Sequence, residues 1–180
     1  MKTLLASALF LVSTLTSAQM NDDLGPQGPV VKMTPAPVAI AVQGTPATVP
    51  LTFRVSSGYH INSNQPKSEF LIPTALKVEA TTDIVIGKTT YPAGQDMSFP
   101  FDPDEKLNVY TGDFKIDVQV RPLHSVPPGK YVVRGTLKYQ ACDNAACYPP
   151  KQLPVIFEVK IAKAPPAPSK NPAQSPHAHQ

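Results

Sequence analysis

Two cysteines, Cys142 and Cys147, are the residues of this sequence whose type and spacing best support chemistry. They are the only cysteines in the 180 residues, and a pair of thiols can form a disulfide or exchange one with another protein. Asp143 and Asn144 between them are turn-forming residues. We therefore expect the two cysteines to face each other across the mouth of a hairpin, within disulfide distance.

The spacing alone leaves the role of this pair open between a structural staple and an exchange site. A disulfide here closes a loop of only six residues, counting both cysteines, and the chain-entropy model gives such a loop about 2 kcal/mol, at the low end for disulfides. A short, exposed disulfide suits exchange, because an attacking thiolate must approach one sulfur in line. Pro149 and Pro150 stiffen the chain just after Cys147.

Zinc binding is a third and weaker interpretation of the cysteines. A structural zinc site needs four ligands, so His60 and His124 would have to join both cysteines. Each histidine lies near a turn without an evident nucleophile beside it, which is typical of ordinary surface or hydrogen-bonding histidines. Other catalytic patterns, such as Gly-x-Ser-x-Gly, His-Glu-x-x-His or a phosphate-binding glycine loop, do not occur in the sequence. We expect no cofactor and no metal.

Charge and the N-terminal segment define the compartment and exclude one class of partner. The net charge is +3, without a dense Lys/Arg run, so nucleic-acid binding is not supported. Residues 1–18 have the pattern of a cleavable signal peptide: Lys2, a short apolar core, and Thr-Ser-Ala at 16–18. The apolar stretch is shorter than the roughly 20 residues of a membrane span. We expect a mature chain without a transmembrane segment that is periplasmic or secreted, where disulfides form.

The elements that must position the cysteines are strands. Apolar residues alternate with polar ones in four runs, at 49–55, 114–120, 131–139 and 155–161, which is the period of a half-buried strand. Turn-forming residues separate these runs, and no window has a sustained helical period. The pattern predicts an all-β fold, an immunoglobulin-like antiparallel β-sandwich over residues 37–161. Cys142 would end one strand, and Cys147 would begin the return toward the last one.

Proline-rich segments flank this domain. The sequence has 22 prolines. Residues 19–36 are predicted to be a flexible lead-in, and residues 162–180 a disordered proline-rich tail. Pro122 and Pro154 suggest guarded edge strands, so we expect a monomer.

Around the cysteines the sequence resembles a known family. Tyr139-Gln140-Ala141-Cys142, an acidic turn, and Cys147-Tyr148-Pro149-Pro150 are similar to the active-site signature of the N-terminal periplasmic domain of the thiol:disulfide interchange protein DsbD. Residues 58–64, 72–74, 91–92 and 109–112 support the resemblance, which covers most of residues 38–161.

The resemblance implies a redox shuttle on an immunoglobulin-like fold. The reduced pair would pass electrons to oxidised periplasmic proteins, and a thioredoxin-like protein or a membrane electron conduit would re-reduce it in trans. Cys147 would form the mixed disulfide and Cys142 would resolve it. A cap loop would shield the pair, matched here by Val109, Tyr110, Thr111 and Gly112. Tyr139, Gln140, Asp143, Tyr148 and Pro149 would flank the site. The competing interpretation is a non-enzymatic binding module whose hairpin disulfide is structural.

Overall fold

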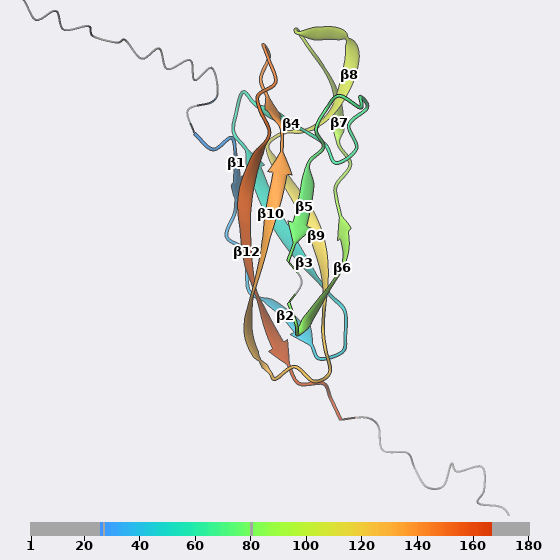
Figure 1. Cartoon of the computed structure of the whole chain (residues 1–180), viewed down its shortest axis with the longest axis vertical. Coiled ribbons are helices and arrows are strands. Elements are labelled where there is room, and N and C mark those ends of the chain that lie inside the picture. Colours follow the sequence, from blue (N-terminus) through green and yellow to red (C-terminus); the bar gives the residue numbers. More distant parts are fainter. Residues whose placement is uncertain (1–25, 27, 80, 167–180) are drawn as a thin grey trace, which may run out of the picture.

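The computed structural model describes residue 26, residues 28–79 and residues 81–166, and this part of the chain contains strands and no helix (Figure 1). No described segment is therefore of the kind that crosses a membrane as a helix. The strands are β1 (Val31–Met33), β2 (Ala39–Val42), β3 (Ala47–Val55), β4 (His60–Asn62), β5 (Ala75–Val78), β6 (Ile84–Thr90), β7 (Gln95–Phe99), β8 (Asp102–Tyr110), β9 (Asp113–Pro122), β10 (Gly129–Tyr139), β11 (Ala141–Cys142) and β12 (Lys151–Ala162).

Two four-stranded sheets form the sandwich and a third sheet lies at one end of it (Figure 1). The main sheets have the strand orders β1-β3-β9-β6 and β2-β12-β10-β5, and the third has the order β11-β4-β8-β7. The predicted all-β, immunoglobulin-like sandwich is confirmed. One pair among the described strands departs from the antiparallel expectation, because β2 runs parallel to β12.

The core between the two main sheets follows from the period-two pattern. Alternate side chains of β3 and β9 point inward, so Leu51 and Ile116, which are cross-strand partners, are both fully buried. Phe53 and Phe114 stack with ring centroids 5.4 Å apart. The facing sheet contributes residues such as Leu137 to the same cluster. Each such buried side chain stabilises the fold by roughly 1.5–3 kcal/mol.

The predicted flexible lead-in, residues 19–36, is wrong in its last part. Val31–Met33 forms β1, which pairs with β3 so that Val31 lies opposite Val55. Val30 and Val31 are fully buried, and burying two valines outweighs the loop-forming character of the surrounding prolines and glycine. The predicted signal peptide lies outside the described residues, as does the predicted tail beyond residue 166.

A long hairpin carries the cysteines to the end of the sandwich. Strands β10 and β12 pair from Gly129 opposite Ile161 to Tyr139 opposite Lys151. Beyond Tyr139 the chain leaves β12, and β11 pairs with β4 of the third sheet instead. The two prolines before β12 have no N–H to extend the β10–β12 ladder. The segment between the two long strands is thereby free to form a separate site.

Candidate functional site

The two cysteines form a disulfide on a tight turn, as the sequence predicted. Cys142 and Cys147 are joined by a 1.96 Å S–S bond, with their Cα atoms 4.0 Å apart, and they face each other as an antiparallel bridge. Their exposure differs. Cys142 is fully buried, whereas Cys147 is partly exposed. A molecule approaching the disulfide from solvent therefore meets Cys147.

Asp143 organises the turn between the cysteines. Its Oδ1 accepts hydrogen bonds from the backbone N–H groups of Ala145, at 2.7 Å, and Ala146, at 2.9 Å. Its Oδ2 accepts a hydrogen bond from the Tyr148 hydroxyl. This last bond is the main cause that lowers the pKa of Asp143, and it raises the pKa of Tyr148 to about 12. We call this contact the Asp143–Tyr148 clamp.

Gln140 ties the cysteine hairpin to the rest of the third sheet. Its Nε2 donates to the backbone carbonyl of Tyr148 at 3.3 Å. Its Oε1 accepts from Asn62 Nδ2 at 3.0 Å and from the backbone N–H of Ile72 at 3.1 Å. A backbone bond from Tyr148 to Ala141, at 2.8 Å, closes the same loop. Gln140 therefore supports the site through hydrogen bonds to both neighbouring segments.

His60 lies beside the disulfide, which sequence reasoning missed. It is the cross-strand partner of Cys142 in the β4–β11 pair, and it is buried, with 3% of its surface exposed. Its Nε2 has no hydrogen-bond partner among the described residues. Burial lowers the pKa of His60 to about 4, against a smaller opposing effect of the Asp143 charge. The prediction of an ordinary surface or hydrogen-bonding histidine is therefore wrong for His60.

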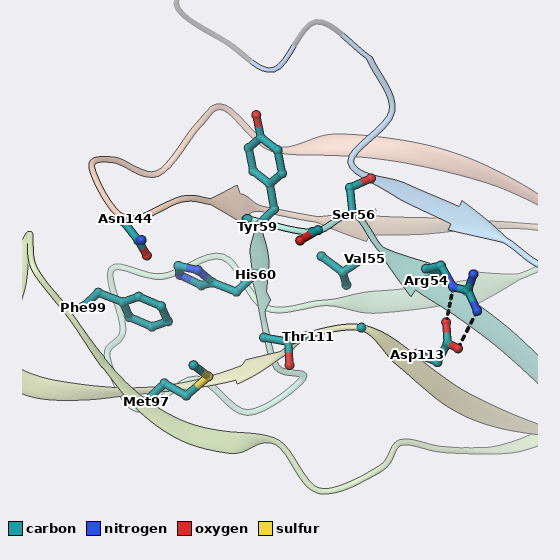
Figure 2. Close-up of a pocket in the computed structure, with 13 residues that line it drawn as sticks. Arg54, Val55, Ser56, Tyr59, His60, Met97, Phe99, Thr111, Asp113 and Asn144 are labelled. Atoms are coloured by element: carbon teal, nitrogen blue, oxygen red, sulfur yellow. Dashed lines mark hydrogen bonds and ion pairs between the residues drawn. The ribbon is translucent and has the colours of Figure 1, made fainter.

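Two phenylalanines cover this histidine. The ring of Phe99 stacks on the imidazole of His60 with centroids 3.7 Å apart, and Figure 2 shows the two side chains next to each other. Phe101 stacks in turn at 5.7 Å from Phe99 and 6.4 Å from His60. Phe99 is buried and Phe101 is partly exposed. We call Phe99 and Phe101, which lie where β7 turns into β8, the aromatic lid.

The four residues of the predicted cap loop lie at the end of β8 and in the turn that follows it. Val109 and Tyr110 are the buried end of strand β8, opposite Asn62 and Ile61 of β4. The Tyr110 hydroxyl donates to Asn64 Oδ1 at 2.6 Å, and its ring stacks on a core phenylalanine.

Thr111 and Gly112 form the turn into β9, where Gly112 has the positive φ of 57° that glycine adopts most readily. The aromatic lid, which the sequence analysis did not predict, covers His60, and Thr111 and Gly112 line the groove that His60 also lines. The sequence feature that could have revealed the aromatic lid is Phe99-Pro100-Phe101, two large aromatic residues in a segment otherwise rich in turn-forming residues.

The other flanking residues have simpler environments. Tyr139 is buried in the main core, and burial raises the pKa of its hydroxyl. Pro149 is exposed. The four residues of the zinc interpretation are not brought together. His60 follows β3, whereas His124 lies against Gly44, which precedes β3, so the two histidines are at opposite ends of a nine-residue strand.

A groove of about 590 Å³ adjoins the disulfide turn (Figure 2). Residues 56–60 line one side, and Met97 and Phe99 line another. Asn144 of the cysteine turn borders the groove, as does the Arg54–Asp113 ion pair, whose N–O distance is 2.6 Å. The groove gives solvent a route to the surface around His60.

Fold and site together define an immunoglobulin-like sandwich with a disulfide hairpin at one end, beside a buried histidine that aromatic rings cover. The family model described as "Thiol:disulfide interchange protein DsbD, N-terminal" matches residues 28–158. The match spans more than half of the chain, and the chain belongs to this family. Membership and the Cys142–Cys147 disulfide together assign the chain to thiol–disulfide interchange in general.

Two solved structures are similar to this chain. The reduced DsbD N-terminal domain of Neisseria meningitidis has 18% identity and a TM-score of 0.43, over 68% of this chain and 82% of that one. The N-terminal periplasmic domain of ScsB from Proteus mirabilis has 13% identity and a TM-score of 0.47, over 71% of this chain and 44% of that one. A comparison with curated proteins gives no match.

Proposed function

We propose that this chain is a periplasmic thiol–disulfide exchange domain that relays electrons between two kinds of partner protein. In this proposal, oxidised periplasmic proteins take electrons from the reduced pair, and a thioredoxin-like protein or a membrane electron conduit returns them in trans. The observation that carries the proposal is the unequal exposure of Cys142, which is fully buried, and Cys147, which is partly exposed. Since exchange requires in-line approach to one sulfur, such a disulfide directs every partner to Cys147.

The exchange has two steps that balance in electrons. The Cys147 thiolate attacks one sulfur of a partner disulfide, forms a mixed disulfide, and releases the other partner sulfur as a thiolate. Cys142 then attacks the sulfur of Cys147 and releases the second partner thiolate. The domain loses two electrons and forms its own disulfide, and the partner disulfide becomes a dithiol. Re-reduction by a donor dithiol follows the same steps in reverse.

The surroundings of the pair support a transient protein partner. Met97 and Phe101 expose apolar surface beside the site, each with 37% of its surface accessible, and aromatic and methionine side chains are enriched at protein interfaces. The groove offers room for a partner segment beside Asn144 of the cysteine turn. The Asp143–Tyr148 clamp holds the turn without using either sulfur, so both remain free for exchange.

The experiment is a redox titration of the purified mature chain against a thioredoxin-like protein, with thiol trapping at equilibrium. We expect the Cys142–Cys147 pair to equilibrate with this protein, and the variant Cys142→Ser to accumulate a mixed disulfide through Cys147. The matched variant Cys147→Ser should accumulate none. A disulfide that no thioredoxin-like protein reduces, and that opens only in denaturant, would overturn the proposal. Partner affinity that survives in the double serine variant would favour the binding-module interpretation.

A further inference from the structure

We propose that His60 is a positioning residue for Cys142: its Nε2–H donates a hydrogen bond to the sulfur of Cys142 whenever the disulfide opens. The inference rests on the proposed function, because the histidine stabilises the thiolate that forms and reacts during exchange. The oxidised structure holds this donor without a partner among the described residues. Opening the S–S bond creates the missing acceptor.

Strand register places the two side chains together. His60 and Cys142 are directly opposite in an antiparallel pair, so their side chains are on the same face of the sheet with Cβ atoms about 4.5–5.5 Å apart. Cys142 is in turn the bridge partner of Cys147. The three residues therefore form a row across the third sheet, in which the buried cysteine lies between the histidine and the partly exposed cysteine.

The buried position of Cys142 creates the need for such a donor. When an incoming thiolate attacks Cys147, the bond to Cys142 breaks and the Cys142 sulfur leaves with the electron pair as a thiolate. That thiolate is fully buried, and burying an unpaired charge is costly. A hydrogen bond from a nearby N–H to a charged acceptor is among the stronger ones in proteins. It favours both the departure of Cys142 and its return as the resolving nucleophile.

The surroundings of His60 suit a neutral donor. The Phe99 ring stacks on one face of the imidazole, and Figure 2 shows the imidazole pointing toward Phe99 and the turn at Asn144. Burial lowers the pKa of His60 to about 4, so the ring is neutral at physiological pH. The ionisable group whose charge acts on it is Asp143, and the lid residues Phe99 and Phe101 are uncharged. A neutral imidazole donates one N–H, and the proposal assigns that proton to Nε2.

The test follows the reaction of the reduced mature chain with 5,5′-dithiobis(2-nitrobenzoate) in two phases. The first phase is attack by Cys147, and the second is displacement of the remaining thionitrobenzoate by Cys142. We expect His60→Phe to keep the rate of the first phase within about twofold of the wild-type rate. The rate of the second phase should fall about tenfold to hundredfold at neutral pH, the range for one hydrogen bond to a charged group. The pH profile of the second phase should move to higher pH. His60→Gln, which keeps an amide donor, should restore much of the rate.

Two controls separate the possible failures. His124→Phe changes an exposed histidine at the other end of β3 and should alter neither phase. A merely structural role for His60 would change both phases together or leave the pH profile in place, and either result would overturn the inference. If wild type shows both phases but does not equilibrate with a thioredoxin-like protein, the proposed function fails independently.

The inference can also be tested on the wild-type chain, so the test does not depend on whether a variant folds. The imidazole nitrogen shifts of His60 in nuclear magnetic resonance spectra report which ring nitrogen carries the proton. We expect the proton on Nε2 in both redox states, with a stronger hydrogen bond after reduction. A proton on Nδ1 in both states would overturn the inference.

Discussion

The hydroxyl of Tyr148 donates a hydrogen bond to the carboxylate of Asp143 across the turn that the disulfide closes. The same carboxylate accepts two backbone N–H groups within the turn. None of these bonds uses a sulfur atom, so they can persist when the disulfide is reduced. Holding two thiols side by side raises their effective concentration, and the clamp is therefore expected to favour the oxidised pair.

Replacing Tyr148 by phenylalanine tests this role of the clamp. Tyr148→Phe removes one hydroxyl and lets the reduced turn open more freely. We expect the equilibrium with glutathione to shift toward the dithiol by about twofold to tenfold, the range for one hydrogen bond. Thiol trapping followed by mass spectrometry measures the shift. Tyr131→Phe is the matched control, because the Tyr131 hydroxyl bonds the carbonyl of Pro127 at the other end of β10. Equal shifts in both variants would contradict the prediction.

The unequal burial of the sulfurs predicts unequal alkylation. In the reduced, folded chain Cys147 should react with iodoacetamide at least about tenfold faster than Cys142, because Cys142 is fully enclosed. Peptide mapping after short exposure gives the two rates. Denaturant should make the rates similar, and equal rates in the folded chain would contradict the arrangement.

The aromatic lid predicts a shielding effect. Phe101→Ala removes a ring that stacks over Phe99 and thereby uncovers the region of His60. We expect reduction by dithiothreitol to accelerate roughly threefold to tenfold, corresponding to the loss of one aromatic pair. Phe70→Ala is the control, because Phe70 is 87% exposed and takes part in no stacking among the described rings. Acceleration in the control alone, or in neither variant, would contradict the prediction.

Burial of His60 predicts an acid-sensitive fold. The folded pKa of about 4 is below the ordinary value of 6.5, so the unfolded chain binds more protons between these values and stability falls as pH decreases from about 6.5 to 4. The contribution is at most on the order of 3 kcal/mol. Urea denaturation at pH 7, 5.5 and 4.5 measures it. In His60→Phe the free energy of unfolding should depend less on pH over this range. An unchanged pH dependence would show that other groups cause it.

Local patterns in the sequence predict most of the core strands and the disulfide hairpin. The alternation in 49–55 and 114–120 predicts strands with buried faces, and those faces are the core of the sandwich. Two cysteines separated by turn formers predict a hairpin disulfide, which the structure contains. Strand β1 escaped prediction because it is three residues long and lies among prolines. Its stability comes from burial against β3, a partner distant in sequence.

The sequence by itself determined the alternating strand segments and the cysteine pair, because periodicity and turn chemistry act between residues close in the chain. The family resemblance rested on the residues around the two cysteines. Only the tertiary structure decided what surrounds the pair. His60 is next to Cys142 through the register of β4 with β11, and Phe99 reaches His60 because β7 and β8 join the same sheet. The register of β8 with β4 places Val109 and Tyr110 opposite Asn62 and Ile61. Cross-strand neighbours are set by register, and register depends on how distant strands share one buried core.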